Sequence, residues 1–204
     1  RTAELIRPIL RGRDIKRYEY LDSGLYLINT HNGVKGKTSR IHIEDYPTVK
    51  AYLDLYWDKI KSRTDQGDTP YNLRNCAYLE DFNKPKIVWG NLNRNASYTL
   101  IENNSFINAP SSMIVPANNY LLGVLNSKVA DYYIRQLGVT RNGGYFEYKP
   151  MFVERIPIPI HSTLITEIER NVILKEEGII DKLVYILYGL NEEEIAYIKS
   201  SVNF

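Results

Sequence analysis

The stretch VTRNGGYFEYKPMFVERIPIPI, residues 139–160, contains the clearest turn and strand-ending signals in the chain. The glycine pair at 143–144 marks a tight turn, because glycine reaches positive φ without a steric penalty. The aromatic run after it predicts a strand at Tyr145–Lys149, and the apolar run that follows predicts a second strand at Phe152–Ile156. The Pro-x-Pro at 157–159 then ends the strand, because proline has no backbone N–H to donate.

The sequence before this stretch mixes helices and strands. Apolar residues at helical spacing predict one helix over 118–137 and another over roughly 47–62, where Pro47 suits the first helical turn. Short runs of β-forming residues, bounded by Asn, Gly and Pro, predict four strands. These strands are expected near Leu25–Asn29, Ile87–Trp89, Ser97–Ile101 and Met113–Val115.

The sequence after the Pro-x-Pro is helical. Ser162 or Thr163 is the expected N-cap of its first helix, and Gly189 is the expected stop of its second. Asn191 stands three residues before Glu194, and this spacing predicts a capping box that opens a third helix.

These elements predict an α+β fold with a twisted, mostly antiparallel sheet and packed helices. We expect one domain over 1–160, followed by a helical C-terminal tail over 161–204 that packs on it. The charge follows a similar division. Residues 163–204 carry eight acidic and four basic residues, a net of −4, whereas residues 1–162 carry 22 basic and 16 acidic residues, a net of +6. A basic body fits a polyanionic partner or a solvated surface.

The composition narrows the class of protein. The single cysteine, Cys76, precludes an intramolecular disulfide, and we therefore expect a reducing cytoplasm. One cysteine and three scattered histidines predict no metal site. No apolar run approaches the ~20 residues that span a bilayer, so no membrane partner is expected. Because the chain begins with Arg1 rather than Met, we expect a segment of a longer protein.

Positive charge is concentrated in RPILRGRDIKR (7–17) and VKGKTSR (34–40). The second segment ends like a P-loop, but His31 stands where that motif needs its first glycine. A flexible basic loop that contacts phosphates is the better interpretation, and its candidate contacts are Lys35, Lys37 and Arg40.

Two further segments combine asparagine with arginine beside glycine: GNLNRN (90–95) and TRNGG (140–144). Asparagine can bind adenine through two hydrogen bonds, and arginine can bind guanine in the same way. The alternative is that both segments are simple Asn/Gly turns. Lys149 also lies close to the second turn in sequence. The candidate DNA contacts from these segments are Asn91, Asn93, Arg94, Arg141, Asn142 and Lys149.

Motifs for bond chemistry are not recognisable. Asp131, Glu147 and Lys149 resemble the acidic-acidic-lysine set of many nucleases, but a chain with 24 acidic residues yields such triplets by chance. No glycine-rich loop follows a strand as a nucleotide cofactor would need, and the Asn-Pro-Pro-Tyr/Phe motif of adenine methyltransferases is absent. We therefore predict no catalytic residue, no metal and no cofactor in this chain.

Five segments, taken in order, resemble the TaqI-like C-terminal specificity domain, which is the target-recognition domain of adenine-N6 DNA methyltransferases and of type IIG restriction-modification enzymes. The LNSK helix followed by Gly-Gly, an aromatic strand and IPIP is also similar to the target-recognition domains of type I specificity subunits. The five segments are LIRPILRGRDIKRY (5–18), KPKIVW (84–89), YLLGVLNSKVADYYI (120–134), GGYFEYKPMFVERIPIP (143–159) and IIDKLVYILYGLNEEEI (179–195).

The resemblance implies a division of labour in a bacterial, cytoplasmic enzyme. A methyltransferase domain, N-terminal in the same parent chain, holds S-adenosylmethionine and flips the target adenine. The present domain reads double-stranded DNA, and the turn at Gly143–Gly144 sets the edge of its recognition sheet. By their position in LRGRDIKR, four cations face DNA or the domain interface: Arg11, Arg13, Lys16 and Arg17.

Two other functions compete with DNA recognition. The acidic helical tail and the 17 tyrosines fit a protein-interaction module with an aromatic hot-spot surface. The Asp131, Glu147 and Lys149 set fits a nuclease, although the sequence gives it no further support.

Overall fold

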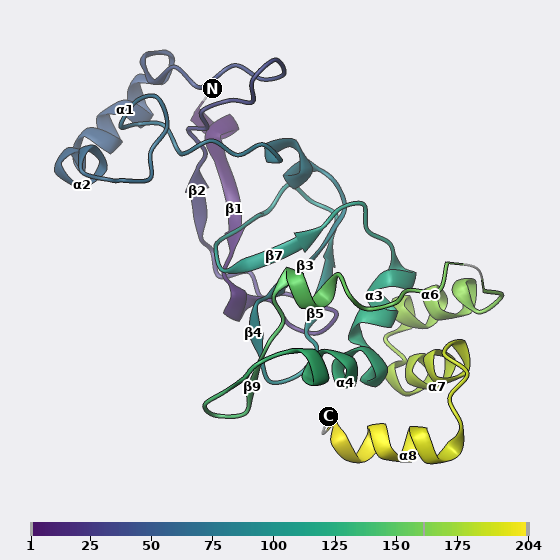
Figure 1. Ribbon diagram of the computed structural model, residues 1–204. Helices are drawn as coiled ribbons and strands as arrows, with labels where there is room; N and C mark the ends of the chain where they lie inside the picture. The colour runs from purple at the N-terminus through teal and green to yellow at the C-terminus, as the bar shows by residue number, and fades with distance from the viewer. Residues whose placement is uncertain (1, 161, 203–204) are drawn as a thin grey trace. The chain divides into compact units, whose positions relative to one another are not determined.

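The computed structural model describes residues 2–160 and 162–202 (Figure 1). Contacts between Cα atoms divide the chain into two compact units. Of the described residues, unit 1 takes in 2–9, 24–83 and 104–106, and unit 2 takes in 10–23, 84–103, 107–160 and 162–202. The boundary expected at 160 falls inside unit 2, and the assignment of 1–160 and 161–204 as domain and tail stays a prediction.

Unit 1 is a small mixed unit whose strand β2 confirms the strand expected near Leu25–Asn29. Strand β1 pairs antiparallel with β2 in a three-stranded sheet of order β2-β1-β6. Its core is formed by Leu5, Ile43 and Val49. The elements are η1 (Thr2–Leu5), β1 (Ile6–Leu10), β2 (Tyr26–Ile28), η3 (Ile43–Asp45), α1 (Pro47–Asp54), α2 (Trp57–Lys61), η4 (Leu79–Asn83) and β6 (Phe106–Ile107).

The single helix expected over 47–62 is wrong, because two short helices occupy that range. Pro47 is at the start of α1, as expected. The N–H groups of Leu55 and Tyr56 donate to carbonyls three residues back, which tightens the chain between α1 and α2. Leu55 is 77% exposed, so it lies outside the core of unit 1.

The central sheet of unit 2 has the order β5-β3-β7, and both neighbours run antiparallel to β3. Every residue of β3 is buried, which explains its continuous apolar run. These strands confirm the three expected in this region, with shifted ends. They are β3 (Lys86–Gly90), β5 (Tyr98–Ile101) and β7 (Ser111–Ile114).

Helices α3 (Asn119–Asn126) and α4 (Lys128–Leu137) replace the single helix expected over 118–137. Ser127 separates them, because it adopts an extended conformation and its hydroxyl accepts a hydrogen bond from the N–H of Ala130. A serine in this position is an N-cap, which ends one helix and begins the next.

The strand expected at Phe152–Ile156 is also wrong. Residues Pro150–Val153 form the short helix α5, with Pro150 at its first position and Lys149 extended before it. A proline at the first helical position has its φ already set for a helix, and this local preference prevails over the apolar run.

The C-terminal helices are α6 (Ile165–Leu174), α7 (Glu177–Leu187) and α8 (Glu192–Ser201). The predicted capping box of Asn191 and Glu194 is confirmed. Gly189 follows α7 with φ +64°, and the two hydrogen bonds of a Schellman motif end the helix there, as expected. The cap expected for α6 is wrong, because Leu164 holds that position and Ser162 instead accepts a hydrogen bond from the Leu164 N–H.

The main core of unit 2 joins these helices to the central sheet. Figure 1 shows α6 lying beside α3, and a side-chain carbon built on Gly123 of α3 lies 2.8 Å from the Cγ2 atoms of Ile168 and Val172. The buried cluster includes Trp89 and Tyr148 from the body and Ile168, Val172 and Val184 from the tail. Within residues 2–160 and 162–202, no helix is long and apolar enough to cross a membrane.

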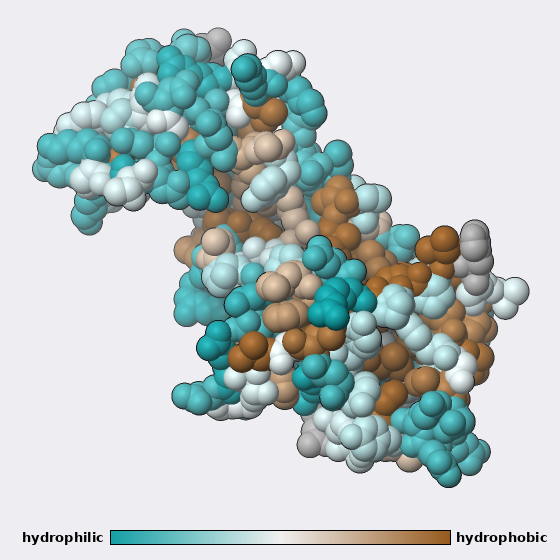
Figure 2. Space-filling model, in the orientation of Figure 1, coloured by the Kyte–Doolittle hydropathy of each residue, from teal (hydrophilic) through white to brown (hydrophobic). Residues whose placement is uncertain are grey.

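Apolar side chains also reach the surface of unit 2. Figure 2 shows brown, hydrophobic atoms gathered over the α6 and α7 region. Exposed residues there include Ile173, Leu174 and Ile186. By contrast, the region of α1 and α2 in unit 1 is mostly teal and white in the same view.

Candidate nucleic-acid interface

A third small sheet brings together the two Asn/Arg segments that are about fifty residues apart in the sequence. Its strands are β4 (Leu92–Asn93), β8 (Thr140–Arg141) and β9 (Tyr145–Glu147), in the order β4-β9-β8. Asn93 pairs with Phe146, and Arg141 pairs with Tyr145. GNLNRN and TRNGG therefore belong to one surface of unit 2, which we call the β4-β9-β8 surface.

The hairpin between β8 and β9 has the tight turn predicted from its glycines. Gly143 and Gly144 have φ values of +79° and +75°, a region that residues with a Cβ avoid. Arg141, Asn142 and both glycines are exposed. The turn therefore presents a polar, sterically open tip, seen beside β9 in Figure 1.

Arg141 and Lys149 both contact the buried carboxylate of Glu147. Glu147 Oε1 accepts a hydrogen bond of 2.6 Å from Arg141 Nε, and Glu147 Oε2 lies 2.7 Å from Lys149 Nζ. The Lys149 and Arg141 cations lower the pKa of the Glu147 carboxyl, so the group stays ionised at neutral pH. The two predicted cations are thus held side by side through Glu147.

The GNLNRN segment is anchored from the helix α4. Arg135 donates to the backbone oxygen of Arg94 at 3.0 Å and to Asn95 Oδ1 at 2.9 Å. Its guanidinium also lies over the ring of Phe146, 4.4 Å from the centroid. Arg94 is exposed and lies 5.1 Å from the ring centroid of Tyr145, so its cation stacks on the hairpin.

The two predicted asparagines of this segment are engaged within the protein. Asn91 Oδ1 accepts a hydrogen bond of 2.7 Å from the Ser112 hydroxyl. Asn93 Nδ2 donates to the Gly90 carbonyl at 2.6 Å, which closes the turn. Both side chains are half-buried. They shape the segment, whereas Arg94 is its most exposed polar group.

The LRGRD turn lies against the same segment. A side-chain carbon built on Gly90 would lie 3.4 Å from the Cα atom of Gly12, so the two backbones touch. Arg11 donates from Nε and Nη2 to Asp14, and this contact lowers the pKa of the Asp14 carboxyl to about 2. Arg11 therefore stabilises the turn, while Arg13 is exposed on it.

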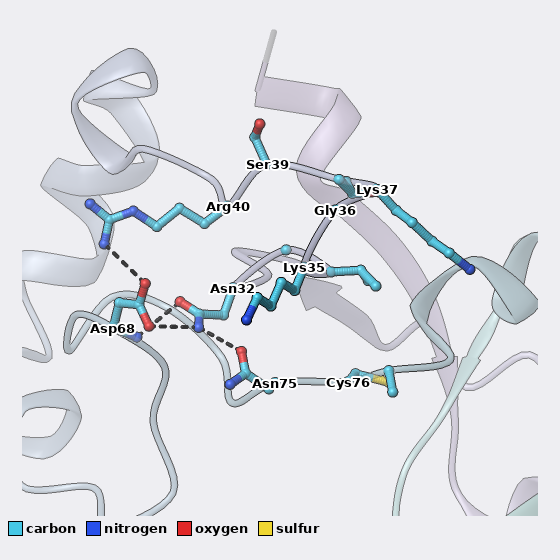
Figure 3. A pocket seen from close by; sticks show the side chains of 13 residues that line it. Asn32, Lys35, Gly36, Lys37, Ser39, Arg40, Asp68, Asn75 and Cys76 are labelled. Carbon is cyan, nitrogen blue, oxygen red and sulfur yellow. Dashed lines mark hydrogen bonds and ion pairs between the residues drawn. The ribbon is translucent and has the colours of Figure 1, made fainter.

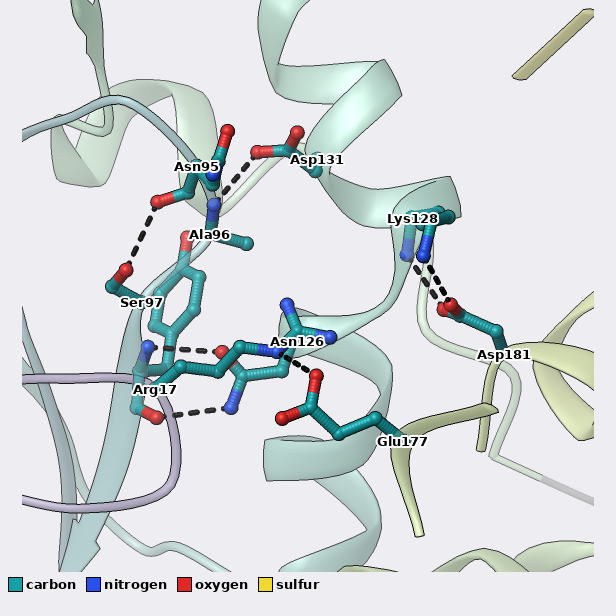
Figure 4. Close-up of polar contacts among 10 residues, drawn as sticks. Arg17, Asn95, Ala96, Ser97, Asn126, Lys128, Asp131, Glu177 and Asp181 are labelled. Carbon is teal, nitrogen blue, oxygen red and sulfur yellow. Dashed lines mark hydrogen bonds and ion pairs between the residues drawn. The ribbon is translucent and has the colours of Figure 1, made fainter. Parts of the chain in front are cut away.

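The next two cations of this segment differ from one another. Lys16 is exposed, whereas the Arg17 side chain is 15% exposed and its Nε donates to Glu177 of α7 at 2.6 Å (Figure 4). Arg17 is thus an interface residue between the body and the acidic tail. The structure brings Arg13, Lys16, Arg94, Arg141, Asn142 and Lys149 to the surface of unit 2 as exposed polar groups.

The remaining predicted cations lie in unit 1. Lys35, Lys37 and Arg40 line an open pocket of about 900 Å³ together with Asp68 and Asn75 (Figure 3). Lys35 and Lys37 are exposed, and Arg40 lies 3.7 Å from an oxygen of Asp68. Reciprocal backbone hydrogen bonds between Val34 and Thr38 close the loop. This basic loop belongs to unit 1, whereas the β4-β9-β8 surface belongs to unit 2.

Asp131 has a structural role that does not fit the nuclease interpretation. Its side chain is 0% exposed and lies 2.8 Å from Arg135 Nε. It also accepts hydrogen bonds from the Ala96 N–H at 2.7 Å and from the Tyr148 hydroxyl. Among the residues that the structure describes, no group of three or more His, Cys, Asp or Glu side chains is placed to hold a metal ion.

The sequence interpretation missed the residues that hold this surface in place. Arg135 and Asp131 stand four residues apart, which places both on one face of a helix, and that spacing was an available signal. The sequence suggests Glu147 only as a nuclease acid. Its actual partners lie six residues before it and two residues after it, across a turn.

The model of the TaqI-like C-terminal specificity domain family matches residues 7–158. A search of curated proteins found no significant match. The matched range ends at the segment that links the hairpin and α5 to the C-terminal helices.

Proposed function

The chain belongs to the TaqI-like C-terminal specificity domain family, and on that premise we propose that it reads a specific sequence in double-stranded DNA. The observation that carries this proposal is the meeting of GNLNRN and TRNGG in one small sheet. Exposed Arg94, Arg141 and Asn142 are side chains of the kind that bind base edges in the major groove.

A division of tasks among the surface residues follows from their geometry. Arg94, which directly follows β4, and Arg141, in β8, are the proposed base-reading groups. Arg13, Lys16 and Lys149 are exposed cations that would contact phosphates and set the register on the duplex. In unit 1, we assign Lys35, Lys37 and Arg40 to phosphate contacts as well.

The parent enzyme in this proposal is a bacterial, cytoplasmic adenine-N6 DNA methyltransferase of a restriction-modification system, of type IIG where it also cuts DNA. Its N-terminal catalytic domain is the second partner of this chain. That domain would bind S-adenosylmethionine, the methyl donor, and flip the target adenine. The residues of the present chain hold the duplex in register, so that the correct adenine reaches the catalytic site.

The proposed function is tested by titrating the chain with a randomised pool of fluorescent duplexes, from low to physiological salt, and by sequencing the bound fraction. We expect affinity to fall steeply with salt, because each neutralised phosphate releases counterions. We also expect an enriched sequence motif. A steep salt dependence without any enrichment would reduce the proposal to phosphate binding, and no binding at low salt would refute it.

The acidic tail offers less support for the protein-interaction function. Glu177 pairs with Arg17, and Asp181 lies 3.0 Å from Lys128 Nζ and also accepts a hydrogen bond from the Lys128 N–H (Figure 4). Two of the eight acids of the tail are therefore used to bind the body of unit 2. This pairing supports a tail that closes the domain rather than one that captures an acid-binding partner.

A further inference from the structure

Glu147 occupies an unusual position below the proposed reading surface. It is the last residue of β9, the middle strand of the β4-β9-β8 sheet, and its side chain is 6% exposed. The Arg141 and Lys149 side chains that contact it are 56% and 47% exposed. A buried anion thus lies beneath two cations that face solvent.

We infer that Glu147 is a positioning residue for sequence recognition, which fixes the guanidinium of Arg141 before DNA arrives. This inference rests on the proposed function and adds a residue to it. Glu147 itself carries a negative charge and is buried, so it is not proposed to contact phosphates or bases. Its effect on DNA passes through Arg141 and, to a smaller degree, through Lys149.

The geometry of the contact fits this role. Glu147 Oε1 binds the edge of the guanidinium that carries Nε and Nη2. The other terminal amino group, Nη1, lies on the opposite edge of the planar group. A free arginine has many rotamers, and ordering one on binding costs conformational entropy. A carboxylate that orders Arg141 in the unbound protein removes much of that cost.

The negative charge of Glu147 predicts opposite changes in random binding and in sequence discrimination. Glu147→Gln keeps the size of the side chain but removes one negative charge from a surface that faces a polyanion. Binding to random duplex should therefore become tighter, with a steeper salt dependence. Discrimination between sequences should fall, because Arg141 is no longer held in one orientation. A purely structural role for Glu147 would not raise random binding while lowering discrimination.

The first test uses the unbound chain and needs no DNA. The order parameter of the Arg141 Nε–H group is measured by NMR in the wild type and in Glu147→Gln. We expect a rigid group in the wild type and a mobile one in the variant. Equal mobility in both proteins would overturn the inference, whatever the DNA results are.

The second test measures affinity for the duplex enriched by the wild type and for the random pool. We expect Glu147→Gln to lower the ratio of the two affinities roughly tenfold, the size of one lost base contact. Asp181→Asn is the matched control, because it removes another buried carboxylate of unit 2, whose partner is Lys128. We expect that variant to keep the ratio.

The two tests separate the inference from the proposed function. An unchanged ratio in Glu147→Gln, with the wild type still selective, would overturn the inference and leave sequence recognition intact. A wild type that binds but enriches no sequence would instead reduce the proposed function to phosphate binding, and the ordering of Arg141 by Glu147 would then be decided by the NMR measurement alone. Thermal unfolding of each variant verifies that it is folded.

Discussion

Asn126 illustrates how a single side chain can join a helix to a strand. Its amide lies in the buried LNSK segment, accepts a hydrogen bond of 3.0 Å from the Tyr98 N–H and donates one of 2.9 Å to the Tyr98 carbonyl (Figure 4). It thus binds both backbone groups of a buried strand residue, and it shares the Tyr98 carbonyl with the Tyr18 N–H, which donates to the same oxygen at 2.9 Å. The next residue, Ser127, caps α4, and Lys128 after it binds Asp181.

Replacing this amide should be costly. We expect Asn126→Ala to lower the free energy of unfolding of unit 2 by about 2–3 kcal/mol, because it removes two buried hydrogen bonds to the Tyr98 backbone. Urea unfolding followed by tryptophan fluorescence measures this in a Trp57→Phe background, where Trp89 alone reports on unit 2. Asn142→Ala, in the exposed turn, is the control and should change stability by less than about 0.5 kcal/mol. Similar losses in both variants would contradict the role of Asn126.

Residue roles were the least predictable part of the site. The sequence identifies Arg141, Asn142 and Arg94 as candidate contacts by residue type, and they are exposed on one sheet. It does not reveal that Arg17 binds Glu177, because the two residues are 160 positions apart. Pairs of this kind depend on how distant segments fold together, and no local spacing predicts them.

At the scale of elements, the paired helices of unit 2 fit together through small residues. Gly123 of α3 faces α6, where a methyl group would meet Ile168 and Val172 at 2.8 Å. Gly178 of α7 has no atom within 4 Å of its would-be side chain. The two glycines are both helical, but only Gly123 has a packing role.

This contrast predicts opposite effects of the same substitution. Gly123→Ala should lower the free energy of unfolding by about 1–3 kcal/mol, because overpacking outweighs the better helix propensity of alanine. Gly178→Ala should leave stability unchanged or raise it by up to about 1 kcal/mol. The same Trp89 fluorescence measurement compares them. If Gly123→Ala were as stable as Gly178→Ala, the close approach of α3 and α6 would be wrong.

Element types were more predictable than element ends. Cap and stop signals indicated the three tail helices that the structure describes, and short β-forming runs indicated the strands of the central sheet. Helical periodicity indicated the helical regions near 47–62 and 118–137. It failed where a short polar signal interrupts the pattern, as Ser127 does between α3 and α4. The strand signal failed at Phe152–Ile156, where Pro150 begins a helix although the following residues are β-forming. Local capping chemistry decided each of these cases.

For the molecule as a whole, the sequence correctly indicates an α+β chain with helices α6, α7 and α8 at its end. Basic residues of the body bind acidic residues of the tail in two ion pairs within unit 2, Arg17–Glu177 and Lys128–Asp181. The division into two units was not foreseen, because the segments of unit 1 are interleaved with those of unit 2 along the chain.

A chain that ends at residue 160 tests how the tail and body depend on each other. We expect it to lose the cooperative unfolding transition of unit 2, because it lacks core residues such as Ile168, Val172 and Val184. Near-ultraviolet circular dichroism and Trp89 fluorescence during urea unfolding measure this. A retained cooperative transition would show that residues 1–160 fold without the tail.

The most direct test of the account compares the sequence preferences of three variants with those of the wild type. Arg94→Ala and Arg141→Ala remove the proposed base-reading groups, and Lys182→Ala removes an exposed cation of α7 as a control. Sequencing the duplexes bound from a randomised pool gives the preference at each position. We predict that each arginine variant relaxes the preference at one position, by about 1–3 kcal/mol, while Lys182→Ala keeps the motif. Equal losses on all sequences in the arginine variants would contradict base reading by the β4-β9-β8 surface.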